Sequence, residues 1–267
     1  MRSKYEKLTD ELKSLGSVAV AFSGGVDSTF LLKAAKNALG NGAVAVTVRS
    51  RLIHANELCE AEDFCKRENI KQIICDVEPL DINGFSENPI NRCYICKKEI
   101  FGIIKKTAEE NGANAVVEGS NLDDNGDYRP GMKAIRELGV LSPLQTAGFT
   151  KREIRKMSEK LGLPTWNKPS LACLASRFAY GEEITAEKLK QVENAERILH
   201  VSGFKQFRVR IHGDIARIEI LPDEFEKLLA IRENLYKDMK ALGFSYVTMD
   251  LQGYRTGSMN EKIVINK

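Results

Sequence analysis

The chain of 267 residues carries a net charge of +3, with 43% hydrophobic and 29% charged residues, a balance typical of globular proteins. This length suits a large domain with a smaller one. The mild charge permits an anionic ligand such as a nucleotide, but it argues against nucleic acid as a partner. No apolar run reaches membrane-spanning length and the N-terminal segment is charged, so we expect no membrane partner and a cytoplasmic location.

Short apolar runs alternate with amphipathic stretches through most of the chain. Buried strands are predicted at 17–22, 43–48, 71–77 and 113–119. Helices are predicted at 26–39, 54–69 and 92–111. A further helix begins after Thr150, which is spaced from Glu153 as in a capping box. This alternation predicts an α/β fold, a doubly wound parallel sheet with helices on both faces.

The pattern changes after the sequence RFAYGEE. A helix is predicted at 185–200, and FRVRIHGDIARIEI then reads as two alternating strands joined in a hairpin. A helix at 222–242 and the strand SYVTMDL follow, which indicates a smaller C-terminal α+β domain. We therefore expect two domains, 1–181 and 182–267.

The segment VAVAFSGGVDSTFLL carries a turn from a predicted strand into a predicted helix. Its glycines let the backbone approach an anion, and N–H groups at the helix start point toward it. Asp27 suits a phosphate site only if Mg²⁺ lies between the two charges. The lysine of a Walker A loop is absent, and a tight turn of small residues is the alternative. The candidate ligands are Ser23, Gly24, Gly25, Asp27 and Ser28.

The SGGVDS string resembles the PP-loop of the ATP pyrophosphatase superfamily. The resemblance implies that the loop holds the β- and γ-phosphates of ATP as leaving pyrophosphate, so that a substrate is adenylated. The sequence EGSN, residues 118–121, follows the fourth predicted strand, at the edge where α/β sheets bind ligands. We expect Gly119 and Arg129 to contact the nucleotide. Three acids are either turn formers or functional groups: Asp123, Asp124 and Asp127.

Six cysteines in a reducing compartment favour metal or catalytic chemistry over disulfides. Cys93 and Cys96 are three apart at the start of a predicted helix, which puts both thiols on one face and favours the thiolate. This pair alone cannot bind a structural zinc ion, which needs four ligands. Cys173 lies in NKPSLACLASRFAYG, which we interpret as a reactive loop. The remaining cysteines are interpreted as structural thiols: Cys59, Cys65 and Cys75.

Four segments extend the resemblance over nearly the whole chain: the SGGVDS loop, RCYICKKEIF, KPSLACLASRFAYGEEIT and FRVRIHGDIARIEI. In this combination the chain resembles the LarE family, sulfur-inserting enzymes in the synthesis of a nickel-pincer nucleotide. The resemblance implies adenylation of a carboxylate of pyridinium-3,5-biscarboxylate mononucleotide. Sulfur transfer then gives the thiocarboxylate.

The cysteines distinguish subtypes within this family. Some members carry only the cysteine that matches Cys173 and sacrifice its sulfur, leaving dehydroalanine. This chain also has Cys93 and Cys96 and matches the three-cysteine subtype, for which the resemblance implies a [4Fe–4S] cluster. Three thiolates leave one iron open to carry sulfide, so sulfide or a sulfur-donor protein is an expected partner.

The C-terminal segment supplies candidate substrate ligands. Arg208 and Arg210 alternate on one strand face and suit a substrate phosphate, with an exposed charged face as the alternative. The family resemblance points to the region of Glu219 for Mg²⁺ or substrate contacts. Arg177 and Lys168 flank Cys173 and are candidates for stabilising the adenylate or the developing charge, with a solvated loop cation as the alternative for either. We also expect a homo-oligomer.

Two other functions compete with this interpretation. Some tRNA thiolation enzymes combine a PP-loop with a CxxC and a third cysteine, but the mild charge and the lack of an RNA-binding appendage argue against this class. A nucleotide-binding regulatory protein without catalysis is the third interpretation, which an intact loop and three matched cysteines disfavour. Release of pyrophosphate with a suitable acceptor distinguishes these classes.

Overall fold

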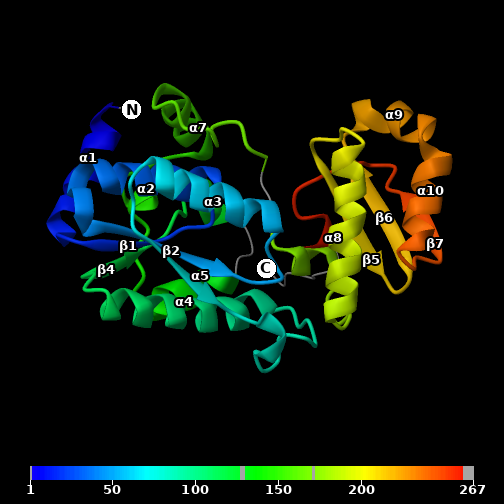
Figure 1. Ribbon diagram of the computed structural model, residues 1–267, viewed down its shortest axis with the longest axis horizontal. Coiled ribbons are helices and arrows are strands. Elements are labelled where there is room, and N and C mark those ends of the chain that lie inside the picture. The colour runs from blue at the N-terminus through cyan, green and yellow to red at the C-terminus, as the bar shows by residue number, and fades with distance from the viewer. Residues whose placement is uncertain (1, 127–129, 170–171, 261–267) are drawn as a thin grey trace. The chain divides into compact units, whose positions relative to one another are not determined.

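The computed structural model describes residues 2–126, 130–169 and 172–260. It divides into two compact units (Figure 1). The first unit comprises residues 1–79 and 93–171, and the second comprises residues 80–92 and 172–267. Within the described residues, no helix combines the length and the apolar character needed to cross a membrane.

The second unit consists of residues 80–92 from the N-terminal half and of a C-terminal piece that begins at Ala172, and the expected division into domains 1–181 and 182–267 stays a prediction. Buried Asn88 joins these two pieces of chain. Its side-chain Nδ2 donates to the carbonyl of Ala179 at 2.6 Å, and its backbone carbonyl accepts a hydrogen bond from Gly181 N at 2.8 Å. Contacts between residues far apart in sequence therefore tie both pieces to the second unit.

The first unit is built on a four-stranded parallel sheet with the order β3-β2-β1-β4, which confirms the predicted α/β class. Its strands are β1 (Val18–Ala21), β2 (Ala43–Arg49), β3 (Gln72–Asp76) and β4 (Ala115–Val117). β1 is hydrogen-bonded to both β2 and β4. Because β1 and β4 are parallel neighbours, the segments that follow them leave at the same edge of the sheet.

Helices cover both faces of this sheet, as the doubly wound pattern predicts (Figure 1). One face carries α1 (Arg2–Leu15), α2 (Val26–Leu39), α3 (Ala55–Arg67), α6 (Pro143–Thr146) and α7 (Lys151–Lys160). The other face carries α4 (Arg92–Glu110) and α5 (Pro130–Glu137). Side chains of β1 alternate accordingly, with Val18 and Val20 in the first core and Ala19 in the second.

The second unit has a smaller mixed sheet with the order β5-β6-β7. Its strands are β5 (Phe207–His212), β6 (Ile215–Ile220) and β7 (Tyr246–Met249), and its helices are α8 (Ala186–Val201), α9 (Phe225–Ala230) and α10 (Arg232–Ala241). β5 and β6 form the predicted antiparallel hairpin, and β7 runs parallel to β6. The helix predicted over 222–242 is divided, because Ile231 leaves the helical conformation with φ −103° and ψ 8°.

Candidate functional site

The loop between β1 and α2 contains the five predicted anion ligands. Gly24 has φ +70°, and a Cβ there would lie 3.3 Å from Ala61 Cβ, so this turn requires glycine. Gly25 caps α2 in an extended conformation, and the hydroxyl oxygens of Ser23 and Ser28 lie 3.1 Å apart. The first N–H groups of a helix have no intrahelical acceptor, and the helix dipole favours an anion beside them.

Asp27 lies in the first turn of α2, and its two carboxylate oxygens differ in their surroundings. Oδ2 accepts a hydrogen bond from Lys151 Nζ at 2.5 Å, whereas Oδ1 is buried without a hydrogen-bond partner in the described part of the chain. Burial raises the pKa of the Asp27 carboxyl, while the Lys151 ammonium acts in the opposite direction. A buried acceptor without a partner is costly, so Oδ1 is a candidate to bind a further donor or a cation.

The environment of Asp27 fits Mg²⁺. This ion takes oxygen ligands, and in nucleotide sites one or two carboxylates usually hold it together with phosphate oxygens and water. Asp27 Oδ1 is such an oxygen, and it is adjacent to the helix start that suits phosphate. Among the described residues, no group of three His, Cys, Asp or Glu side chains is arranged to hold a metal ion.

Gly119, which follows β4 and Glu118, lies directly against the start of α2. A Cβ at Gly119 would lie 3.0 Å from Ser28 N and 3.2 Å from the carbonyl carbon of Asp27, so glycine permits this close approach. Buried Glu118 accepts hydrogen bonds from Ser120 N and Ser120 Oγ, at 3.0 and 2.8 Å, which fixes the backbone here. Gly119 is therefore beside the loop, and its contact with a nucleotide stays a prediction.

The structure describes two of the three acids that follow, and each accepts a hydrogen bond from a backbone N–H group. Asp124 Oδ2 accepts a hydrogen bond from Asn121 N at 2.9 Å, and Asp123 Oδ2 accepts one from Lys151 N at 2.8 Å. The Asp124 contact lies within a turn, whereas the Asp123 contact reaches the start of α7, so a functional role for these acids stays a prediction. Asp127 and Arg129 lie outside the described residues.

Two lysines contact the loop, although sequence reasoning gives neither of them this role. Lys168 Nζ donates to the carbonyl of Gly24 at 3.2 Å and to Glu60 at 2.7 Å. In the sequence, Lys168 is associated with the nearby Cys173, and no motif singles out Lys151. The available signal for Lys151 is its place directly after Thr150, whose predicted capping box is confirmed at the start of α7.

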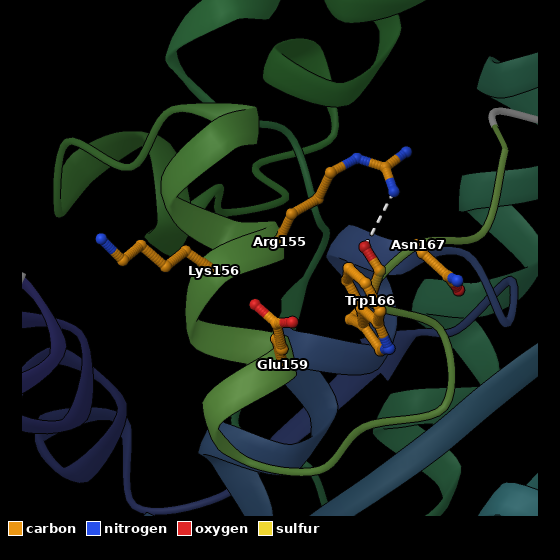
Figure 2. A pocket seen from close by; sticks show the side chains of 5 residues that line it. All are labelled: Arg155, Lys156, Glu159, Trp166 and Asn167. Carbon is orange, nitrogen blue, oxygen red and sulfur yellow. Dashed lines mark hydrogen bonds between the residues drawn. The ribbon is translucent and has the colours of Figure 1, made fainter.

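A cavity of about 510 Å³ lies beside α7 (Figure 2). It is lined by Arg155, Lys156, Glu159, Trp166 and Asn167. The guanidinium of Arg155 donates to the carbonyls of Trp166 and Lys168, each at 2.8 Å. Arg155, in the wall of this cavity, therefore holds the backbone of the segment that contains Lys168. Lys168 in turn contacts the loop between β1 and α2.

The six cysteines form no disulfide with one another. Cys93 and Cys96 are half-buried in the first turns of α4, as predicted, and belong to the first unit. Cys173 belongs to the second unit, where it is exposed and precedes a short 3₁₀ helix, Leu174–Arg177. Of the three interpreted as structural thiols, Cys65 is buried and Cys75 half-buried, but Cys59 is exposed.

Arg177 holds the segment that carries Cys173. It is fully buried, and its Nε and Nη2 donate to Glu196 of α8 at 2.8 and 2.9 Å. Its Nη1 donates to the carbonyls of Ala172 and Cys173, at 2.5 and 3.1 Å. We expected a substrate contact for Arg177. The structure directs its guanidinium to protein groups instead, because Glu196 offers a matching bidentate carboxylate.

Arg208 and Arg210 are buried. They therefore do not form the exposed charged strand face that was the alternative prediction for them. Arg210 Nη2 lies 2.8 Å from Glu219 Oε2, so two predicted substrate ligands contact each other. The guanidinium of Arg208 lies 5.3 Å from the ring centroid of Tyr254. Burial lowers the pKa of Arg208 to about 10, and nearby Arg177 adds to this effect. The second unit therefore buries three arginines, of which Arg177 and Arg210 are paired with the buried carboxylates of Glu196 and Glu219.

Comparison with curated proteins gives matches along nearly the whole chain. The chain is 37% identical to the pyridinium-3,5-bisthiocarboxylic acid mononucleotide synthase of Lactiplantibacillus plantarum, over 98% of this chain and 96% of that protein. It is 40% identical to an uncharacterized protein of Synechocystis sp., over 97% of this chain and 98% of that protein. It is also 30% identical to a glutamine-hydrolyzing GMP synthase component of Thermoplasma volcanium, over 65% of this chain and 60% of that protein. No family model matches the chain.

The parallel sheet, the SGGVDS loop after its first strand and the similarity to the GMP synthase component define a fold of the PP-loop ATP pyrophosphatase type. Within that class, the chain belongs to the family of the pyridinium-3,5-bisthiocarboxylic acid mononucleotide synthase, the LarE family. Because it matches a named synthase over nearly its full length, the protein is an enzyme. The three-cysteine subtype stays a prediction.

The surroundings of the thiols predict different rates of alkylation. Burial raises the pKa of Cys65 to about 12, so at pH 8 almost none of this thiol is the reactive thiolate. Brief treatment of the native, iron-free protein with iodoacetamide at pH 8 should modify the exposed Cys59 and Cys173 while Cys65 stays unmodified, as peptide mass spectrometry would show. Alkylation in denaturant, where all six thiols should react, is the control. Equal rates at Cys65 and Cys173 in the native protein would contradict the assigned burial.

Proposed function

We propose that this protein is an ATP-dependent sulfurtransferase of the cytoplasm. It adenylates a carboxylate of pyridinium-3,5-biscarboxylate mononucleotide and then replaces a carboxylate oxygen with sulfur. The observation that carries the proposal is the loop at Asp27, which combines a helix start with a buried carboxylate oxygen that has no hydrogen-bond partner among the described residues. Sequence similarity supports the substrate, because the chain is 37% identical to a synthase named for the corresponding bisthiocarboxylic acid.

In the first step, N–H groups at the start of α2 and the hydroxyls of Ser23 and Ser28 bind the β- and γ-phosphates of ATP. Mg²⁺ at Asp27 would neutralise charge that accumulates on the pyrophosphate. A carboxylate oxygen of the substrate attacks the α-phosphorus, and pyrophosphate leaves with the bonding electrons. Gly119 packs closely against Ser28, so no side chain projects from position 119 beside the start of α2.

The second unit supplies the candidate ligands of the mononucleotide phosphate. Arg208 and Arg210 offer planar guanidinium groups that suit a phosphate, and Glu219 fixes the orientation of Arg210. Arg177 acts through the backbone at Cys173 and not by a direct contact with substrate. Formation of a homo-oligomer is also part of the proposal.

In the second step, sulfur attacks the acyl-adenylate carbon and AMP leaves, taking one former carboxylate oxygen with it. We assign Cys93, Cys96 and Cys173 as ligands of a [4Fe–4S] cluster, whose open iron would supply sulfide from solution or from a donor protein. The assignment rests on residue type and on the family resemblance: none of the three thiols is in a disulfide and two share one helix start, although the described residues show no three such side chains grouped around a metal site. Sacrifice of the Cys173 sulfur is the alternative within the same function.

The acceptor is tested by pyrophosphate release. With ATP and Mg²⁺, release should depend on pyridinium-3,5-biscarboxylate mononucleotide and not on tRNA, because a carboxylate is the proposed nucleophile. Asp27→Asn should lower the rate by about tenfold to a hundredfold, since a neutral amide holds Mg²⁺ poorly. Asp10→Asn, at an exposed position of α1, is the charge-matched control and should leave the rate unchanged. Stimulation by tRNA alone, or an undiminished rate for Asp27→Asn, would contradict the proposal.

The sulfur source is tested by iron content. Protein prepared without oxygen should be brown, with about four irons per chain. Alanine at Cys93, Cys96 or Cys173 should remove the iron, whereas alanine at Cys59, Cys65 or Cys75 should not. With sulfide supplied, one chain should turn over repeatedly without loss of mass at Cys173. A colourless protein that stops after one turnover, with dehydroalanine at position 173, would establish sacrifice instead.

A further inference from the structure

The C-terminal segment lies against the strands that carry the candidate phosphate ligands. It turns at Gly253, which has φ +72° and where a Cβ would lie 2.6 Å from the carbonyl oxygen of Ile220, so this turn requires glycine. Tyr254 N donates to the same carbonyl at 2.7 Å. These contacts anchor the segment to the end of β6.

Beyond this anchor, side chains hold residues 256–260, which we call the strap. Ser258 and Asn260 make hydrogen bonds to side chains elsewhere in the second unit. Within the described residues, no backbone–backbone hydrogen bond joins the strap to the rest of the unit, and Asn260 N donates to the carbonyl of Gly257 inside the strap. The strap can therefore separate from the sheet without breaking the hydrogen bonds of the sheet itself.

Ser258 connects the strap to the ion pair of Arg210 and Glu219. Its hydroxyl donates to Glu219 Oε1 at 2.7 Å and accepts a hydrogen bond from Arg210 Nη2 at 3.1 Å. Ser258 is buried, so water has little access to this position. One hydroxyl oxygen of the strap therefore covers part of the Arg210 guanidinium.

The Ser258 hydroxyl limits the N–H groups that Arg210 can offer to a ligand. A guanidinium has five N–H groups. Arg210 directs two of them to Glu219 Oε2, from Nε at 3.1 Å and from Nη2 at 2.8 Å, and one from Nη1 to the carbonyl of Ser176 at 3.1 Å. Ser258 takes the second N–H of Nη2. Among the described residues, these contacts leave one N–H of Nη1, whereas a bidentate contact with phosphate needs two.

We propose that substrate displaces the strap: the Ser258 hydroxyl occupies the position of a phosphate oxygen on Arg210 in the substrate-free protein, and the phosphate of the mononucleotide takes its place. This inference rests on the proposed role of Arg210 in binding substrate. A phosphate oxygen is charged and forms a stronger hydrogen bond with a guanidinium than a neutral hydroxyl does. The exchange therefore favours phosphate, while Glu219 keeps Arg210 in the same orientation.

A strap that completes the site gives the opposite expectation. If Ser258 stayed in place and donated to the phosphate, substrate would hold the strap more firmly, and loss of the hydroxyl would weaken binding. If Ser258 is displaced, substrate frees the strap. Loss of the hydroxyl then leaves the affinity unchanged or raises it, because no contact with Arg210 has to be broken first.

Limited digestion with trypsin tests the movement, because Arg255 directly precedes the strap and cleavage after it releases a peptide that begins at Thr256. Saturating pyridinium-3,5-biscarboxylate mononucleotide should speed this cleavage by about fivefold or more, since native-state proteolysis follows the population of the open form. Mass spectrometry identifies the peptide. The same compound without its phosphate, and magnesium–ATP, are the control ligands and should leave the rate unchanged.

Two variants test the contact itself. Ser258→Ala should speed cleavage after Arg255 in the absence of any ligand, because the strap loses its hydrogen bonds to Arg210 and Glu219. In calorimetry this variant should bind the mononucleotide as tightly as the native protein or up to about tenfold more tightly. Ser245→Ala, at an exposed position outside the strap, is the matched control and should change neither the cleavage nor the affinity.

The contrary outcomes separate failure of this inference from failure of the proposed function. If the native protein binds no mononucleotide, the proposed function fails and this inference fails with it. If the native protein binds the mononucleotide and cleavage after Arg255 is unchanged or slower, only displacement of the strap is wrong. Weaker binding by Ser258→Ala than by the native protein would also overturn the inference, because the hydroxyl would then be a ligand of the substrate.

Discussion

The constraint on which the candidate site of the first unit depends is the burial of the Asp27 carboxylate at the start of α2. Its burial raises the pKa of the carboxyl, so the charged form needs a compensating cation. The ammonium of Lys151 meets this need at one oxygen and leaves the other buried without a partner among the described residues. A protein that keeps such a group bears a cost in stability of about 1–3 kcal/mol, which is reasonable where a cation binds as part of function.

Several elements are arranged around this carboxylate. β1 and β4 bring Gly119 against the start of α2, where a side chain would collide with the Ser28 amide. α7 places Lys151 beside Asp27. Arg155, on the same helix, donates to the backbone carbonyls of Trp166 and Lys168, and the Lys168 ammonium donates to the carbonyl of Gly24 in the loop. The loop is therefore supported by basic residues from one helix and the segment after it. This arrangement suits a site that must hold a highly charged anion in one orientation.

Local patterns predicted much of the fold. The parallel strands, the helices on both faces, the capping box at Thr150 and the β5–β6 hairpin each depend on residues close together in sequence. What the sequence could not show was pairing over long distances. The salt bridge of Lys151 with Asp27 and the attachment of residues 80–92 to the second unit have no local signal. Burial of Arg208 and Arg210 was also hidden, because an alternating charged strand resembles a solvated one until its partners are known.

The central claim is that the loop directs attack of a carboxylate at the α-phosphorus of ATP. The most direct measurement uses pyridinium-3,5-biscarboxylate mononucleotide labelled with ¹⁸O in its carboxylates, together with ATP, Mg²⁺ and sulfide. Mass spectrometry of the nucleotide product then reports which bond was formed. The account predicts AMP that carries one ¹⁸O atom, because the oxygen that attacked phosphorus leaves with AMP when sulfur takes its place. Unlabelled AMP, or ADP with inorganic phosphate, would contradict it.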